Sequence, residues 1–267
     1  MPTYLDSILV AHRRRAAEDT RPKEMLDELI ADLPPTRGFA AALRARVAND
    51  HEIAVIAEIK RRSPSRGDLA LDLDPAVLAS DYSRGGAAAI SVLTDEEFFS
   101  GAVADLKLAR EAVDLPVLRK DFTVSFRDLY DARAMGADAA LLIVAALAQD
   151  ELVSLVALSA ELGLSALVEV HDEAELVRAL DAGATLVGVN QRDLHTFEVD
   201  TDRALRVGEA IPDDVVRVAE SGVRVPADAS RLFDAGFHAV LVGETLVRAD
   251  DPAEALRQLR SGRVASQ

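Results

Sequence analysis

Apolar residues along the chain recur in eight short runs, separated by longer segments in which apolar positions repeat every three to four residues. Short runs of this kind are typical of parallel strands buried on both faces. In several units a glycine ends the segment before the next run, as at Gly136, Gly163 and Gly236, where a helix end favours the left-handed conformation. The runs are residues 54–59, 88–93, 116–119, 139–144, 166–170, 185–189, 215–219 and 239–242.

The periodic segments between the runs predict eight helices. The first opens with Asp74-Pro75, a capping residue followed by a first-turn proline. Strands and helices that alternate in this way over about 210 residues favour an α/β fold, a single (β/α)8 TIM barrel. A doubly wound open sheet is the alternative, although it rarely has eight near-equal units. The expected helices are residues 74–84, 102–112, 126–134, 150–162, 172–182, 201–209, 227–235 and 252–260.

About 50 residues precede the first run, and they predict a helical extension. One amphipathic segment contains Leu5, Ile8 and Leu9, a second follows around residues 25–30, and a third short one lies near residues 39–43. The extension is too small to fold independently. We therefore expect a single domain over residues 1–267, with an N-terminal helical extension at 1–50 and the barrel at 51–267.

Composition and charge limit the classes of function. No apolar run approaches the ~20 residues of a membrane span, and the N-terminus has no secretion signal. The chain has no cysteine, which excludes disulfides, thiolate metal sites and cysteine nucleophiles. Its net charge of −16 opposes binding to nucleic acid and to anionic membranes. We expect a cytoplasmic protein that binds neither, and an anionic substrate would need a local basic cluster.

Lysine is rare in this chain. Of 30 basic residues only Lys23, Lys60, Lys107 and Lys120 are lysines, and the others are arginines. An ammonium group can give up its proton during catalysis, whereas a guanidinium effectively cannot. Lys60 and Lys120 come at the ends of the first and third predicted strands, and active sites of these barrels lie at the C-terminal strand ends.

Other polar side chains also lie at the ends of the predicted strands. Taken together they support a catalytic site more strongly than any one of them does alone. Glu58 and Lys60 are two residues apart, so they point to the same side of their strand. A lysine beside a glutamate supplies an acid and a base from one cluster. His171, after the fifth strand, is interpreted as a helix-entry residue. The other strand-end candidates are Glu169, Asn190, Arg192 and Glu220.

Two glycine turns, Ser221-Gly222 and Gly243-Glu244, follow the last two strands and each precede a helix. Glycine lets a ligand approach the backbone, and N–H groups at helix starts attract anions. Phosphate sites after strands seven and eight recur in this fold. The turns therefore predict a phosphorylated small-molecule ligand. No clustered histidine or cysteine set predicts a metal.

Taken together, these segments resemble the indole-3-glycerol-phosphate synthase family, over essentially the whole chain. The resemblance implies ring closure of 1-(2-carboxyphenylamino)-1-deoxyribulose 5-phosphate, with loss of carbon dioxide and water, in tryptophan biosynthesis. It implies no cofactor and no metal, and other enzymes of the pathway are possible partners. The matching segments are residues 56–65, 116–122, 167–171, 188–194, 219–222 and 241–244.

The resemblance also implies roles for individual residues. Lys120 would be the acid in ring closure and Glu169 the base in dehydration. Lys60 would hold the substrate carboxylate or act as the dehydration acid, Glu58 would orient the lysines, and Asn190 would bind a carbonyl or hydroxyl oxygen. Arg192 and Glu220 would support the site. The remaining substrate- and phosphate-binding candidates are Ser63, Phe122, Ser221, Gly222, Gly243 and Glu244.

Three alternatives stay open at this point. A sister barrel of the tryptophan pathway shares the glycine turns, but the isomerase among them uses a cysteine base that this chain lacks. A Schiff-base aldolase carries a lysine on a barrel strand, and borohydride would trap its imine. A non-catalytic barrel would bind a phosphorylated ligand without turnover.

Overall fold

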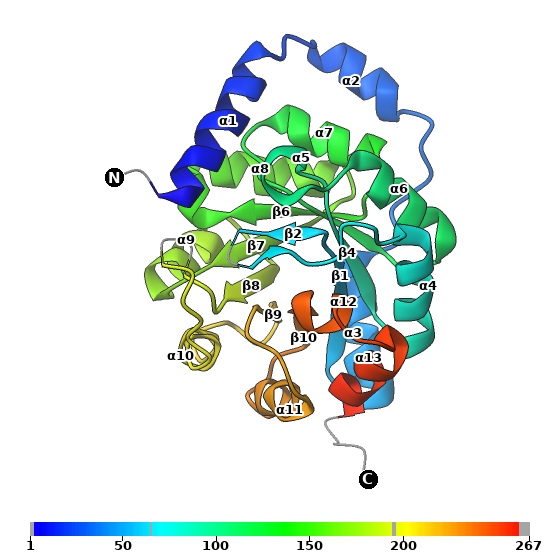
Figure 1. Ribbon diagram of the computed structural model, residues 1–267. Helices are drawn as coiled ribbons and strands as arrows, with labels where there is room; N and C mark the ends of the chain where they lie inside the picture. The colour runs from blue at the N-terminus through cyan, green and yellow to red at the C-terminus, as the bar shows by residue number, and fades with distance from the viewer. Residues whose placement is uncertain (1–2, 65, 194–195, 262–267) are drawn as a thin grey trace.

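The computed structural model describes residues 3–64, 66–193 and 196–261, and its centre is a closed barrel of eight parallel strands. Going around the barrel the order is β1-β10-β9-β8-β7-β6-β5-β4, and β4 pairs with β1 to close it (Figure 1). This confirms the predicted TIM barrel and rules out the open sheet. The strands are β1 (Ala54–Ile59), β4 (Ala89–Leu93), β5 (Val117–Lys120), β6 (Ala139–Ile143), β7 (Ser165–Val170), β8 (Leu186–Asn190), β9 (Val216–Glu220) and β10 (Ala239–Val242).

The strand ends differ from the predicted runs by one residue in several places. The third run was expected to end at Arg119, yet β5 includes Lys120, and β8 and β9 likewise continue to Asn190 and Glu220. An apolar run marks only the buried part of a strand. Here the ladder continues through one polar residue whose side chain faces the open end of the barrel.

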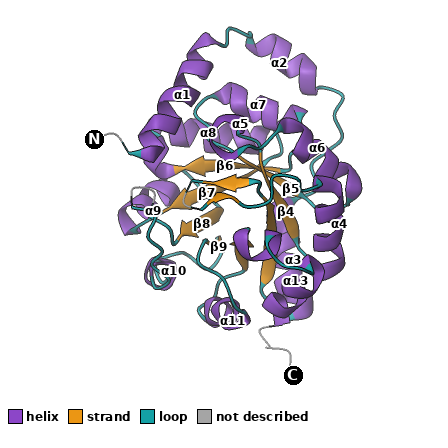
Figure 2. Cartoon of the chain, in the orientation of Figure 1, coloured by secondary structure: helices purple, strands orange, loops and turns teal. Residues whose placement is uncertain are grey.

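Helices surround the strands on the outside (Figure 2). Side chains at their starts satisfy free backbone N–H groups: Asp74 caps α4, Ser125 caps α7 and Asp172 caps α9. These helices cover the apolar outer face of the barrel, which leaves the strand ends for function. They are α4 (Pro75–Gly85), α6 (Val103–Ala112), α7 (Phe126–Ala134), α8 (Gln149–Glu161), α9 (Glu173–Asp181), α10 (Arg203–Gly208), α11 (Pro226–Asp234) and α13 (Pro252–Ser261).

Small elements that the sequence pattern did not predict lie in the loops. A hairpin of β2 (Arg62–Ser63) and β3 (Gly67–Asp68) follows β1, and in Figure 1 it lies in front of the barrel. Each of these elements is too short for a periodic pattern to identify. The others are α5 (Glu96–Phe99), the 3-10 turn η1 (Val144–Ala146) and α12 (Glu244–Val247).

The N-terminal extension has two structurally different parts. The helix α3 (Phe39–Asp50) buries Phe39 and Leu43 completely and contacts β1, β4 and β9. Just before it, the Arg37 backbone N–H donates to Asp138, which precedes β6. The helix therefore covers the N-terminal ends of the strands and belongs to the core.

The first two helices, α1 (Tyr4–Glu18) and α2 (Lys23–Ile30), lie outside the ring next to α7 and α8 (Figure 1). Arginine pairs attach them: Arg13 binds Glu151 on α8, and Arg21 binds Asp131 on α7. Within the described ranges, no helix combines the length and apolarity needed to cross a bilayer.

Candidate active site

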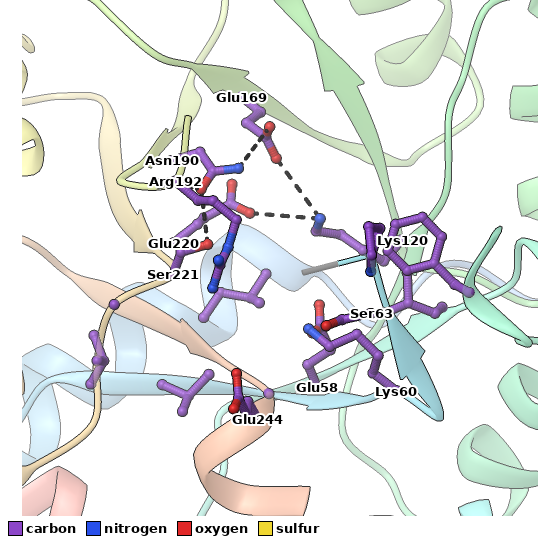
Figure 3. Close-up of a pocket in the computed structure, with 18 of the residues that line it drawn as sticks. Glu58, Lys60, Ser63, Lys120, Glu169, Asn190, Arg192, Glu220, Ser221 and Glu244 are labelled. Atoms are coloured by element: carbon purple, nitrogen blue, oxygen red, sulfur yellow. Dashed lines mark hydrogen bonds and ion pairs between the residues drawn. The ribbon is translucent and has the colours of Figure 1, made fainter. Parts of the chain in front are cut away.

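The C-terminal ends of the strands surround one cavity of about 440 Å³. That volume suits a small ligand. Figure 3 shows the lysines and carboxylates from different strands pointing into it. The thirteen residues proposed from sequence all line this cavity: Glu58, Lys60, Ser63, Lys120, Phe122, Glu169, Asn190, Arg192, Glu220, Ser221, Gly222, Gly243 and Glu244. Ser65 and Leu194, which belong to two of the matched segments, lie outside the described residues.

The side chains of Glu58 and Lys60 form an ion pair on one wall of the cavity. Strand alternation places both on the inner side of β1, as the spacing predicted. Glu58 is almost fully buried, and the buried Tyr82 fixes its backbone by donating a hydrogen bond to the Glu58 carbonyl at 3.1 Å. The Lys60 ammonium therefore has a fixed position in the cavity, with its charge balanced when no ligand is bound.

Lys120, on β5 two strands around the barrel from β1, lies between two glutamates. Its Nζ is 3.8 Å from Glu169 Oε2 and 4.0 Å from Glu220 Oε2 (Figure 3). Burial opposes a charge on Lys120, but the acidic groups around it, Glu169 first among them, outweigh burial and raise the lysine pKa. The side chain is therefore held as an ammonium, the form that can donate a proton.

The pKa values of the two glutamates are shifted in opposite directions. Burial would raise the pKa of Glu169, but the charge on Lys120 and the hydrogen bonds of its neighbours lower it instead. Burial and the nearby Glu169 charge raise the pKa of Glu220 to about 8. One buried carboxyl is thus ionised and can accept a proton, while the other favours its neutral form.

Neighbouring residues fix both glutamates. Asn190 Nδ2 donates to Glu169 Oε1 at 3.1 Å, and Asn190 Oδ1 accepts from the Ser221 hydroxyl at 2.9 Å, which sets the orientation of the amide. Gly188 on β8 leaves the space for Glu220, because a Cβ there would overlap the Glu220 carboxylate. Glu169 Oε2 and Glu220 Oε1 are buried and have no hydrogen-bond partner among the described residues, so neither oxygen is satisfied by the protein.

The glycine turns form one end of the cavity. Ser221 and Gly222 both have positive φ, 65° and 80°, which turns the chain sharply after β9. Gly243 lies beside the Glu58–Lys60 pair, and a Cβ there would overlap the Glu58 carboxylate. Three arginines also line the cavity, namely Arg192, Arg224 and Arg248. This end combines open backbone with basic side chains, as an anion requires.

Apolar side chains line another part of the cavity, and the sequence analysis did not identify most of them. Phe99 and Phe122 have ring centroids 6.1 Å apart, and Phe197 also lines the wall. The N-terminal helix supports this wall, because Tyr4 packs edge-on against Phe98 and Phe197. Aromatic residues are only 4% of the chain, so the adjacent pair Phe98-Phe99 in a loop was a detectable signal.

A buried ion-pair network fastens the same helix to the barrel. His12 Nε2 lies 2.9 Å from Asp95 and 3.8 Å from Asp121, the residue after Lys120. Although these three residues are spaced as metal ligands could be, Arg15 also approaches Asp95 and Arg119 pairs with Asp121 at 2.9 Å. The cluster is therefore compensated by arginine and connects α1 to the loop beside Lys120.

The cavity is built for a ligand with an aromatic part and an anionic part, with proton donors and an acceptor between them. Comparison with known proteins agrees. Residues 5–259 match the family profile described as "Indole-3-glycerol phosphate synthase". Proteins of that description are similar along most of their length. One from Chloroherpeton thalassium is 48% identical over 251 residues (93% of this chain, 96% of the relative), and one from Kineococcus radiotolerans is 50% identical over 260 residues (96% and 94%).

Solved structures with the same architecture are more distant in sequence. A thiamine phosphate pyrophosphorylase from Pyrococcus furiosus superposes with a TM-score of 0.59 at 16% identity, covering 79% of this chain and 95% of that one. An N-acetylmannosamine-6-phosphate 2-epimerase from Clostridium perfringens has the same TM-score at 14% identity, covering 77% and 89%. At such identities the likeness establishes the barrel fold alone.

Proposed function

The chain belongs to the indole-3-glycerol phosphate synthase family, and on that premise we propose how its cavity performs the reaction of this carboxy-lyase of tryptophan biosynthesis. The substrate is 1-(2-carboxyphenylamino)-1-deoxyribulose 5-phosphate, as the sequence resemblance implies. One observation carries the proposal: Lys120 Nζ lies 3.8 Å and 4.0 Å from two buried carboxyl groups, those of Glu169 and Glu220. These side chains stand between an aromatic wall and a glycine-rich basic end.

Ring closure is assigned to Lys120. The aromatic carbon that carries the carboxylate attacks the C2 carbonyl, and negative charge develops on the carbonyl oxygen. The Lys120 ammonium donates its proton to that oxygen, which becomes a hydroxyl. Loss of carbon dioxide leaves its bonding electrons in the ring and restores aromaticity.

Dehydration is assigned to Glu169 as the base. The carboxylate takes the anilino proton while the new hydroxyl, protonated by an ammonium group, leaves as water. The methylene carbon next to the nitrogen then loses a proton and the nitrogen regains one, which forms the carbon–carbon double bond of the indole. The position of Glu169 supports the role, because Glu169 lines the cavity and its Oε2 lies 3.8 Å from Lys120 Nζ. Its lowered pKa keeps it ionised, although it is a stronger base only once that ammonium has lost its proton. Asn190 binds the reacting oxygen, and the neutral form of Glu220 supports the site.

Lys60 is proposed to bind the substrate carboxylate and to be the alternative acid in dehydration. The Lys60 ammonium already pairs with Glu58, which fixes its position. The incoming substrate carboxylate binds the same ammonium group. The substrate's aromatic ring is placed against Phe122 and the apolar wall. The phosphate is placed against Ser63, Ser221, Gly222, Gly243 and Glu244, with Arg192 close by.

Replacing Gly243 by valine is expected to raise KM at least tenfold. The new side chain enters the space assigned to the phosphate. Its Cβ also meets the Glu58 carboxylate and lies 3.2 Å from Lys60 Nζ, so kcat is expected to fall together with the rise in KM. Steady-state kinetics measure the effect. Gly183→Asn is the control for a glycine distant from the cavity, because asparagine tolerates the left-handed φ of 83° at that position, and we expect its KM to match wild type. An unchanged KM in Gly243→Val would place the phosphate elsewhere.

The proposed function is tested by a fluorescence assay for indole-3-glycerol phosphate, with EDTA present and no added cofactor. We expect full turnover after exhaustive chelation, because the two ammonium groups supply the acids that the reaction needs. Activity that returns only with a divalent ion would overturn this chemistry. Inactivation by borohydride with substrate present would favour the aldolase, and binding without turnover would favour a non-catalytic barrel. A cytoplasmic location and association with other enzymes of the pathway remain predictions.

A further inference from the structure

His171 lies between the active-site cavity and a second, smaller cavity. It follows β7 directly and precedes Asp172, the cap of α9, so it does stand at a helix entry as the sequence suggested. Glu169 lines the first cavity, whereas His171 lines the second, which has a volume of about 280 Å³. The imidazole ring therefore lies behind Glu169, on the side away from the active-site cavity.

The two ring nitrogens of His171 face two different glutamates. Nε2 lies 3.4 Å from Glu169 Oε1, and Nδ1 lies 3.0 Å from Glu175 Oε2. The same Glu175 oxygen accepts the backbone N–H of His171 at 2.8 Å, and the Asp172 side chain accepts the backbone N–H of Glu175. The first turn of α9 therefore fixes the ring in one orientation.

The charges around this histidine favour its protonated form. Burial alone would lower the pKa of His171, but Glu169 and Glu175 outweigh burial and raise it to about 10. Further charged residues from neighbouring elements line the second cavity, but only Glu169 and Glu175 act strongly on the ring. Asp193 and Arg203 lie there and pair at 3.7 Å, and the others are Asp172, Glu173 and Arg206.

Glu169 is in turn faced by side chains from three other strands of the barrel and by the residue two positions after it. Lys120 approaches from β5, Asn190 donates from β8, Glu220 lies on β9, and His171 stands behind it. Lys120 and His171 are the two cations of this group. Lys120 is the residue that the proposed mechanism deprotonates, so in the second half of the reaction only the imidazolium is certain to remain charged beside the base.

We propose that His171, held by Glu175, is a positioning residue that keeps Glu169 ionised and oriented for dehydration after Lys120 has given up its proton. The proposal rests on the base role of Glu169 in the proposed function. His171 touches no substrate atom in this scheme, since its ring faces Glu169 from the side away from the cavity. Its positive charge compensates the carboxylate at the step where the lysine charge is absent.

The test compares three variants by the pH dependence of kcat between pH 4 and 9. His171→Gln keeps an N–H donor near the Nε2 position and removes the charge. Glu175→Gln leaves the ring but weakens its charge, and Glu173→Gln is the matched control, an exposed glutamate on the first turn of the same helix. An opposite charge at this distance moves a carboxyl pKa by about 1 to 3 units.

We expect His171→Gln to keep kcat near the wild-type value at neutral pH and to lose it progressively in acid, with KM nearly unchanged, because the acid limb of the profile moves upward by about one pH unit. The sign follows from the pKa of Glu169: without the imidazolium it rises, so the base is lost at a higher pH. Glu175→Gln should move the limb in the same direction by less. Glu175→Gln added to His171→Gln should cause no further shift, and Glu173→Gln should match wild type.

A second measurement does not depend on activity. Imidazole 15N NMR should show His171 protonated on both nitrogens at pH 8 in wild type, and Glu169→Gln should lower its pKa. A neutral ring in wild type would overturn the proposal, as would a His171→Gln enzyme with equal loss at every pH. If Glu169→Gln itself retains full activity, the base assignment fails, and that result is separate from the protonation state of His171.

Discussion

A Lys120→Arg enzyme is expected to lose kcat by a factor on the order of 10² to 10⁴, the usual contribution of a general acid. The substitution keeps a positive charge between Glu169 and Glu220, where Lys120 now lies within 4.0 Å of both. Arginine can bind these carboxylates well, often through two parallel hydrogen bonds. It cannot give its proton to the carbonyl oxygen, so binding is retained while ring closure is slowed.

The measurement is kcat and KM for each of three Lys→Arg variants, with the melting temperature of each. Lys107, an exposed residue on α6, is the matched control and should show no change. Lys60→Arg should mainly change KM if Lys60 binds the substrate carboxylate, and should approach the loss of Lys120→Arg if it is the dehydration acid. Near-normal kcat in Lys120→Arg would remove the acid role from Lys120.

The barrel could be predicted because its strands are buried on both faces. Such strands are continuous apolar runs, and the glycines that end the helices mark where each run begins. The same burial also indicated the site. A charged residue such as Glu58 or Glu169 is unfavourable at the end of a buried apolar strand, so its presence there points to a function. In Lys120 the scarcity of lysine added a second signal.

What the sequence did not indicate depends on contacts between distant segments. Phe197 reaches the cavity from the loop after β8, and Tyr4 from α1 packs behind it, a pairing that no local pattern encodes. The burial of Phe39 in the core was hidden because α3 is only weakly amphipathic and looked like part of the extension. His171 was interpreted from its place before a helix, and its contact with Glu169 becomes evident only when the ring is placed.

The two buried glutamates beside Lys120 are expected to respond very differently to the same isosteric change. Glu169→Gln should lower kcat by a factor on the order of 10² to 10⁴, because glutamine cannot accept the anilino proton. Glu220→Gln should be much milder near neutral pH, since the raised pKa of Glu220 already favours a neutral carboxyl, which an amide resembles. The geometry supports the comparison, because both carboxylates approach the same ammonium at 3.8 and 4.0 Å.

Single-turnover experiments separate the two steps that these residues serve. In the proposed sequence carbon dioxide leaves before water, so Glu169→Gln should release carbon dioxide at a rate near wild type while indole fluorescence appears late. Lys120→Arg should delay both signals together, because the acid acts in the first bond-forming step. Glu220→Gln serves as the control for loss of a carboxyl at the same depth, with 2% exposure against 1% for Glu169. If Glu169→Gln delays carbon dioxide as much as indole, or if Glu220→Gln is equally impaired, the base must be sought at another residue.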